Sequence, residues 1–456
     1  MSPLDLIVRG AAVVAAGEAR RLDLAVQDGR IAELGEELAG PAREELDARG
    51  LHAVPGAIDA HVHFNEPGRT DWEGFGSGTR ALAAGGATVG VEMPLNAHPP
   101  TVSAAAFDAK RACAERAAHV DFALWGGLVP GGVDAMDELA ARGVVGFKAF
   151  MSESGIDDFP RADDLTLFEG MRRAAALDLP VAVHAENEAI TAGLAARARD
   201  AGRTAMRDYL ASRPAVAELE AIVRALTLAE EAGCAVHIVH VSTGRGVALV
   251  AEARARGVDA SCETCPHYLL LGEEDAEALG ALAKCAPPLR PASEREALWN
   301  ALADGTLPMV ASDHSPAPRS MKETGDAFAD WGGISGCQTL LPLLLGEGHR
   351  ERGLALPLLM EAVAGFVARR LRLRGKGRLE PGADADLALI DLRAEGVLAA
   401  GDLHYRHPHS PFVGHRLRAR VVRTLLRGRT VFADGRIVGR PAGRLLTPDP
   451  EEGDRP

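Results

Sequence analysis

The 456-residue sequence lacks several features that mark particular classes of protein. Pro, Gly or a charged residue interrupts every apolar stretch before about 18 residues, the length that a membrane-spanning helix needs, so no membrane partner is expected. Positive charge is not in excess, because 50 Lys and Arg stand against 64 Asp and Glu, and the net charge of -14 predicts no nucleic-acid partner. The N-terminal segment MSPLDLIVRG lacks the basic start and apolar run of a secretory signal, and we expect a cytoplasmic protein.

Cysteine and lysine are both scarce. The six cysteines are scattered without a dense spacing pattern, which favours reduced thiols over a disulfide framework. Cys262 and Cys265 form one C-x-x-C pair, but the second pair that a zinc knuckle needs is absent, so structural thiols are favoured over a metal or redox role. Lysine occurs only at positions 110, 148, 284, 322 and 376, which makes a lysine inside an apolar strand unusual in this chain.

The middle of the chain alternates between two kinds of segment. Short apolar runs rich in β-forming residues are separated by Ala/Leu/Arg/Glu-rich helical stretches, such as 215–233 and 244–257, as in repeated βα units. The eight runs cover residues 53–63, 88–94, 120–129, 144–151, 180–187, 235–243, 259–270 and 308–316. They predict an α/β fold in which residues 53–370 form a (β/α)8 TIM barrel.

The two ends of the chain differ from the middle and resemble one another. Residues 1–52 and 371–446 show Val/Ile alternation broken by Gly and Asp turns, which indicates antiparallel strands and hairpins. We therefore expect one small β-sandwich domain assembled from the N-terminal and C-terminal segments. The last residues, 447–456, are rich in Pro and charged residues and are expected to form a disordered tail.

The H-x-H pair of the DAHVH segment, His61 and His63, is the strongest local motif. Alternate residues of a strand point the same way, so both imidazoles are predicted to enter the barrel at the C-terminal end of a strand. The pair alone is weak, because the chain contains 15 histidines and such a pair also arises on a surface or in a core.

Four more predicted strand ends each carry a potential metal ligand, and these are Lys148, His184, His240 and Asp313. Catalytic groups of TIM-barrel enzymes gather at the C-terminal face of the barrel and come from several strands. A structural role explains any one of these residues. It does not explain why five strands, counting the one with the H-x-H pair, each carry a potential ligand at the same end of the barrel. A shared metal site accounts for the whole set.

Lys148 is chemically unusual as a ligand, because an ammonium group has no lone pair and repels a cation. A carbamate formed with carbon dioxide removes this difficulty and gives an anion with two oxygens that suits two metal ions. The alternative is an ordinary lysine paired with Glu153 or Asp157. Asp313 is predicted both to bind metal and to act as the general base and acid, whereas His237 and His314 are predicted to point away from the site.

The motifs DAHVHFNEPG, EMPLN, GFKAFM, HAEN, HVS, CAPPLR, SDHSP, WGGISG and PGADADLALID together resemble the cyclic amidohydrolases of the amidohydrolase superfamily over nearly the whole chain. This family includes dihydroorotases, dihydropyrimidinases, hydantoinases and allantoinases. The resemblance implies two divalent metal ions, with zinc as the first expectation and manganese, cobalt or iron as alternatives, and a homotetramer. It also implies a set of metal ligands with Lys148 as N6-carboxylysine and Asp313 as the catalytic residue, and this set is His61, His63, Lys148, His184, His240 and Asp313.

Asn65 bears on the substrate, because it occupies the position at which dihydroorotases carry an arginine that binds the substrate carboxylate. An amide suits a neutral ring better, and the motif variants resemble the allantoinase branch, which implies hydrolysis of the hydantoin ring of allantoin to allantoate. The expected substrate contacts are Asn65, Asn96, the backbone at Ala286, and Ser315. The alternatives are hydantoinase, dihydropyrimidinase or dihydroorotase-like activity and, from another class, a non-catalytic scaffold, although no ligand position is substituted.

Overall fold

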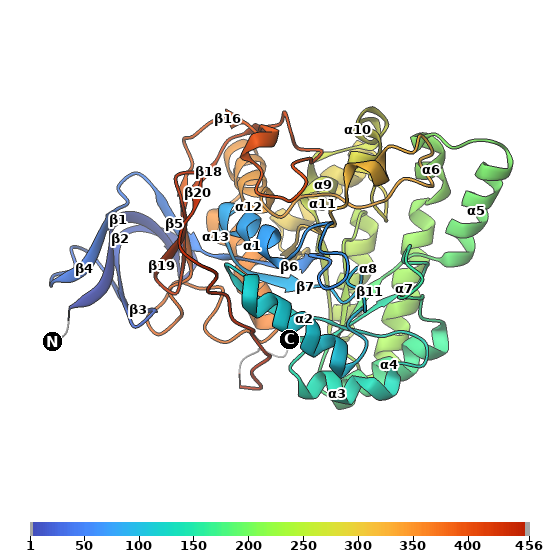
Figure 1. The fold of residues 1–456 in the computed structure, drawn as a ribbon, viewed down its shortest axis with the longest axis horizontal. Coiled ribbons are helices and arrows are strands. Elements are labelled where there is room, and N and C mark those ends of the chain that lie inside the picture. The colour runs from blue at the N-terminus through green and yellow to red at the C-terminus, as the bar shows by residue number, and fades with distance from the viewer. Residues whose placement is uncertain (1–2, 452–456) are drawn as a thin grey trace.

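A computed structural model describes residues 3–451 and shows a barrel of parallel strands joined to a sheet built by the two ends of the chain (Figure 1). The barrel strands are β6 (Ala57–Val62), β7 (Ala87–Glu92), β8 (Asp121–Leu124), β9 (Gly126–Gly127), β10 (Phe147–Phe150), β11 (Val181–His184), β12 (Val236–Ile238), β13 (Ala260–Thr264) and β14 (Met309–Val310). Each predicted run overlaps one of these strands, and the run 120–129 contains both β8 and β9, which Trp125 separates. The predicted TIM barrel is confirmed.

Backbone hydrogen bonds close the barrel. Parallel pairing runs from β6 to β8 and from β9 to β14. The two sheets meet where the Val145 N–H donates to the Leu124 carbonyl at 3.0 Å, and the ring closes where the His63 N–H donates to the His314 carbonyl at 2.7 Å. The closing bond lies next to two predicted site residues, so barrel closure itself holds them together.

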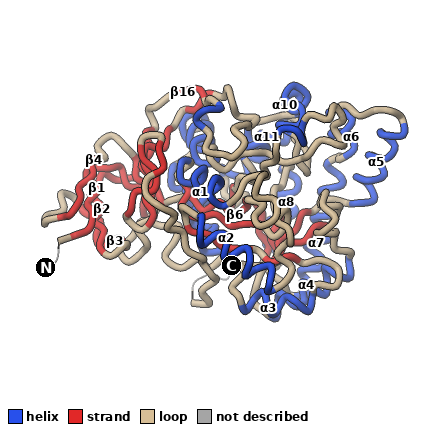
Figure 2. The backbone as a smooth tube through the Cα atoms, viewed as in Figure 1, coloured by secondary structure: helices blue, strands red, loops and turns tan. Residues whose placement is uncertain are grey.

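Helices cover the outside of the barrel, while strands dominate the end of the molecule near the N-terminus (Figure 2). The helices are α1 (Phe75–Ala84), α2 (Ala104–Ala117), α3 (Met136–Ala141), α4 (Asp164–Ala176), α5 (Glu188–Asp200), α6 (Met206–Ser212), α7 (Ala215–Ala232), α8 (Gly244–Ala255), α9 (Pro266–Leu270), α10 (Glu273–Leu279), α11 (Ala292–Ala303), α12 (Leu340–Leu343), α13 (Leu356–Met360) and α14 (Phe366–Arg370). Local sequence explains their ends: α7 stops at Gly233 with a left-handed φ of 62°, and the Asn187 side chain accepts the Ile190 N–H at the start of α5.

The two ends of the chain share one nine-stranded sheet. Its strands are β1 (Leu4–Ala15), β2 (Glu18–Gln27), β3 (Arg30–Gly35), β4 (Ala42–Asp47), β5 (His52–Pro55), β15 (Leu387–Asp391), β18 (Arg420–Leu426), β19 (Arg429–Ala433) and β20 (Arg436–Ile437). Antiparallel pairing of β5 with β15 joins the N-terminal part to the C-terminal part, and Leu6, Leu24, Leu387 and Leu425 belong to one buried apolar cluster. The proposed boundary between residues 52 and 53 falls inside β5.

The chain after β20 returns to the barrel. The Leu446 N–H donates to the Phe122 carbonyl at 2.8 Å, and the Asp449 N–H donates to the Arg372 carbonyl at 2.9 Å. Within the predicted disordered tail, Asp449 therefore makes a backbone hydrogen bond to the segment that follows α14. Residues 452–456 of the tail lie outside the described residues. Among residues 3–451, no helix has the length and apolar character that crossing a membrane requires.

Candidate metal centre

The six predicted ligands lie at the C-terminal ends of five barrel strands. His61 belongs to β6 and His63 follows it, Lys148 belongs to β10, and His184 is the last residue of β11. His240 and Asp313 follow β12 and β14. All six side chains are buried. This arrangement follows from the parallel sheet, because strands that run the same way end on the same face.

His61, His63 and Asp313 form the tightest group of potential ligands. The Nε2 atoms of His61 and His63 lie 3.3 Å and 3.5 Å from Asp313 Oδ1. One ligand atom from each residue lies within 4.8 Å of the others. On the adjoining side, His184 Nδ1 lies 3.0 Å from His240 Nε2, and the His240 ring centroid lies 5.5 Å from that of His61. The four imidazoles and the carboxylate thus form one continuous cluster.

Two of these residues have strained backbones. His240 and Asp313 have φ angles of 41° and 46°, in the left-handed region that non-glycine residues rarely adopt. Such a conformation costs on the order of 1 kcal/mol per residue and persists where the surrounding structure imposes it, as at functional sites. Because of these backbone angles, neither side chain points in the direction that the alternation of an extended strand would give it.

Lys148 lies in the same interior, and its Nζ is 4.9 Å from the centroid of the Phe150 ring. Its side chain is fully buried, and within residues 3–451 its Nζ has no hydrogen-bond acceptor. Burial lowers the pKa of Lys148 to about 7. The alternative of a simple ion pair with Glu153 is not realised, because the Glu153 side chain is 64% exposed and its carboxylate lies 3.7 Å from Arg161.

The protonation states suit metal ions. Burial lowers the pKa of His61, His184 and His240, so these imidazoles are neutral and keep a lone pair. Burial on its own would raise the pKa of Asp313, but His61 and the other neighbouring histidines hold it well below its usual value. The donors are therefore imidazole nitrogens, an ionised carboxylate and an unpartnered amine, and this set fits two divalent cations with Lys148 as a carbamate.

Glu263 fixes the orientation of His61, and no sequence motif indicated this role. Its Oε1 lies 2.6 Å from His61 Nδ1, and its Oε2 lies 3.2 Å from His237 Nε2. Burial would raise the pKa of Glu263, but His61 and His237 lower it to about 2, so the carboxylate accepts and His61 Nδ1 donates. His61 Nε2 is thereby left free to face Asp313. His237 contacts Glu263 and Ser261, away from the ligand group, as predicted.

We expect Glu263→Gln to weaken metal binding by roughly 10- to 100-fold, because partners of a ligating histidine contribute about this much to affinity. Metal content after dialysis against graded chelator concentrations measures the change. Glu73→Gln is a matched control, because Glu73 is equally buried and its Oε1 accepts the Arg406 N–H at 3.1 Å, outside the predicted ligand set. Equal chelator resistance in the Glu263 variant and the wild type would contradict the orienting role.

A cavity of about 340 Å³ opens beside the ligand group, and its size is typical of a site for a small molecule. It is lined by His61, His63, His184, His240 and Asp313, and also by the predicted contacts Asn96, Ala286 and Ser315. Asn65 is the exception and corrects our expectation. It is fully buried outside the cavity lining, and its Nδ2 donates to the Pro316 carbonyl at 3.3 Å, so it shapes the loop instead of contacting a ligand.

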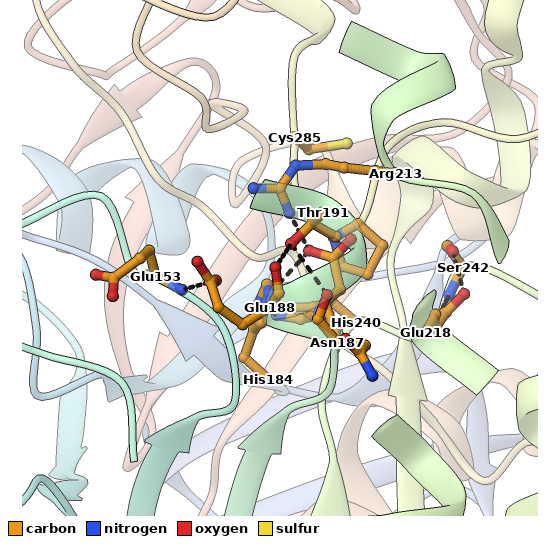
Figure 3. A network of polar contacts seen from close by, with 12 residues as sticks. Glu153, His184, Asn187, Glu188, Thr191, Arg213, Glu218, His240, Ser242 and Cys285 are labelled. Atoms are coloured by element: carbon orange, nitrogen blue, oxygen red, sulfur yellow. Dashed lines mark hydrogen bonds and ion pairs between the residues drawn. The ribbon is translucent and has the colours of Figure 1, made fainter. Parts of the chain in front are cut away.

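The sequence did not identify several other side chains that line the cavity. Phe150 and Trp331 supply apolar walls, and Tyr209, Arg213 and Lys284 come from α6 and from loops. Figure 3 shows Arg213 beside Cys285, with its guanidinium directed toward the side chains around His184 and His240. Trp331 begins the WGGISG segment and Lys284 immediately precedes the CAPPLR segment, but no motif surrounds Tyr209 or Arg213.

The barrel, the buried donor set at its C-terminal face and the adjoining cavity define a metal-dependent hydrolase. The family described as "Amidohydrolase family" matches residues 52–431, and the chain belongs to this family.

Full-length similarity to known proteins is high. The chain is 65% identical to an allantoinase of Rubrobacter xylanophilus, with 100% of both chains covered, and 55% identical to an allantoinase of Solibacter usitatus, with 97% of both covered. Among solved structures, an L-hydantoinase (dihydropyrimidinase) from Arthrobacter aurescens is 35% identical and has a TM-score of 0.95, with 97% of this chain and 100% of that one covered. The family implies hydrolysis of a cyclic amide with the help of divalent metal.

Proposed function

We propose that this chain is an allantoinase, which opens the hydantoin ring of allantoin by hydrolysing its amide and releases allantoate. The observation that carries the proposal is the 65% identity to an allantoinase over the full length of both chains. The buried donor set and a cavity of about 340 Å³ supply the chemistry and the space that a small ureide needs.

The reaction follows from the placement of Asp313. The histidines, a carboxylated Lys148 and Asp313 would hold two divalent cations, which would supply a water molecule of lowered pKa and polarisation of the ring carbonyl. Asp313 is ionised and accepts the proton that the water loses as its oxygen adds to the carbonyl carbon. Asp313 then returns this proton to the ring nitrogen as the C–N bond breaks, and the carboxyl group formed on the carbon side releases its remaining proton to solvent and becomes a carboxylate.

Other side chains hold the ring during this reaction. We assign hydrogen bonding with the ring to Asn96, Ser315 and the backbone at Ala286, which all line the cavity. Phe150 stacks on the His184 ring at a centroid distance of 4.5 Å and excludes water from that side of the ligand group. Zinc as the native metal, and carbon dioxide as the source of the Lys148 carbamate, belong to the same proposal.

We also propose a homo-oligomer, with a tetramer as the expectation from the family resemblance. An apolar groove of about 810 Å³ between α7 and α8 supports it, because Val216 and Val223 there are 56% and 46% exposed. The groove is flanked by charges of both signs, including Glu220 and Arg245, as in an interface between identical chains. A cytoplasmic location stays a prediction.

A second candidate is hydantoinase or dihydropyrimidinase activity, which the structural similarity to the Arthrobacter aurescens enzyme favours. Steady-state kinetics with allantoin, hydantoin, dihydrouracil and dihydroorotate separates the two candidates. We expect kcat/KM for allantoin to exceed each of the others by at least about 100-fold, a preference that a few well-placed hydrogen bonds provide. A higher kcat/KM for any of the other three substrates would overturn the allantoinase assignment.

A further inference from the structure

A chain of polar contacts leads from the ligand group to a cationic side chain in the cavity wall. Glu186 follows β11 and is fully buried, and its Oε2 lies 3.0 Å from His184 Nε2. The same Oε2 accepts a hydrogen bond from Arg213 Nη1. Arg213 thus lies one carboxylate away from a predicted metal ligand, and it follows α6, outside every motif of the sequence.

Arg213 has hydrogen-bonding capacity that the protein does not use. A guanidinium carries five N–H donors. Within residues 3–451, only Nη1 has a hydrogen-bond acceptor, which is Glu186. The side chain lines the cavity, is 19% exposed, and stacks against Tyr209 with its central carbon 5.5 Å from the ring centroid. The remaining donors are therefore available to a molecule in the cavity.

The charge balance decides what kind of group Arg213 suits. Glu186 and Arg213 form an ion pair, and the Glu186 carboxylate also lies 3.0 Å from His184 Nε2. The pair carries no net charge, yet its N–H donors remain rigidly placed. Such an anchor suits the carbonyl oxygen of a neutral amide or urea, because a carboxylate would also meet the negative charge of Glu186.

Allantoin carries such a group. It differs from hydantoin by a ureido substituent on the ring carbon next to the carbonyl that is attacked. With that carbonyl at the ligand group, the substituent projects along the cavity wall. We propose that Arg213 binds the ureido carbonyl oxygen of the substrate and so sets the preference for a ring that bears this substituent. This inference rests on the proposed allantoinase function.

The competing explanation is that Arg213 only balances the buried charge of Glu186. In that case its loss would disturb His184 and lower the rate for every substrate alike. A ureido anchor predicts a selective effect instead, because hydantoin offers no ureido group to lose. The ratio of kcat/KM for allantoin to that for hydantoin therefore separates the two roles.

The test compares Arg213→Lys, Arg213→Gln and the double variant Arg213→Gln/Glu186→Gln, each with its metal content measured. We expect KM for allantoin to rise about 10- to 100-fold in Arg213→Gln while kcat/KM for hydantoin changes by less than about threefold. Arg213→Lys keeps the charge but loses the planar donor group, so we expect an intermediate ratio. The double variant leaves no buried charge unpaired and keeps the test informative if Arg213→Gln folds poorly.

A binding measurement without turnover completes the test. Allantoate carries two ureido groups, and N-carbamoylglycine, the product from hydantoin, carries one. Calorimetric titration should show that Arg213→Gln loses affinity for allantoate and keeps it for N-carbamoylglycine. Arg197→Gln is the control, because Arg197 is an exposed arginine of α5 outside the cavity lining. We expect this variant to leave the ratio of the affinities for allantoate and N-carbamoylglycine unchanged.

The outcomes are distinguishable. An equal fall of kcat/KM for both substrates in Arg213→Gln, or an unchanged preference for allantoin, would overturn the role of Arg213 and leave the allantoinase function intact. A wild-type protein that prefers hydantoin would refute the proposed function itself.

Discussion

Replacing Lys148 by alanine is expected to lower kcat/KM at least about a thousandfold and to reduce the bound metal from about two ions per chain to one or none. Lys148 comes from β10, whereas the H-x-H pair lies at the end of β6, and Lys148 is fully buried. As the proposed carbamate it would supply an anion with two oxygens to the metal site. Elemental analysis of the purified variant, together with steady-state assays, measures both effects.

Comparison with Lys376 shows why an unmodified Lys148 is unfavourable. Lys376 is also buried, but its Nζ lies 2.8 Å from Asp121 and 2.7 Å from Asp386. Burial would lower the pKa of Lys376, but these carboxylates raise it above its usual value, whereas the pKa of Lys148 falls to about 7. At neutral pH a large fraction of Lys148 is therefore the free amine, which is the form that reacts with carbon dioxide.

Lys376→Met is the matched control for Lys148→Ala. Removing a buried ammonium from its carboxylate partners costs about 3–5 kcal/mol, so we expect a lower melting temperature, with the metal content of the folded protein unchanged. Metal-free wild-type protein should regain activity faster with zinc and bicarbonate than with zinc alone. Full activity of Lys148→Ala, or recovery that does not depend on bicarbonate, would refute the carbamate.

The barrel and the ligand positions were predictable because they depend on local patterns. Each apolar run is a strand, and parallel strands end at one face, so His61, Lys148 and Asp313 could be expected to meet without knowledge of their contacts. The shared Val/Ile alternation of the two ends predicted a joint β domain for the same reason, and the two ends form it as one nine-stranded sheet. The pairing of β5 with β15 shifts the boundary by a few residues, and composition does not reveal such a shift.

Contacts between distant segments were not predictable. Glu263 meets His61 across 202 residues of sequence, and Arg213 meets Glu186 from a helix end with no motif of its own. Asn65 was misplaced because its φ of 64° breaks the alternation of the preceding strand and turns the side chain toward Pro316. Sequence patterns report which residue types occur at strand ends, but the direction of a loop side chain depends on backbone angles that the pattern does not contain.

The second large effect is expected for Asp313→Asn, in which kcat should fall about 100- to 10,000-fold, the usual contribution of a general acid and base. Asparagine keeps the size of the side chain and one oxygen ligand, but it does not accept a proton from the attacking water. In the wild type the histidines around Asp313 hold its pKa well below its usual value, so the carboxylate is ready to accept throughout the neutral range. KM should change much less, because substrate contacts are left in place.

Two controls make this result specific to proton transfer. Metal content must be measured in the same sample, because Asp313 is also a predicted ligand, and rates are compared per metal-loaded chain. His314→Asn changes the neighbouring residue, whose Nδ1 accepts the Gly336 N–H and whose ring packs 4.8 Å from that of Tyr405, and we expect its kcat to stay within about tenfold of wild type. If metal-loaded Asp313→Asn also stays in that range, the proton passes through another group and Asp313 acts as a ligand alone.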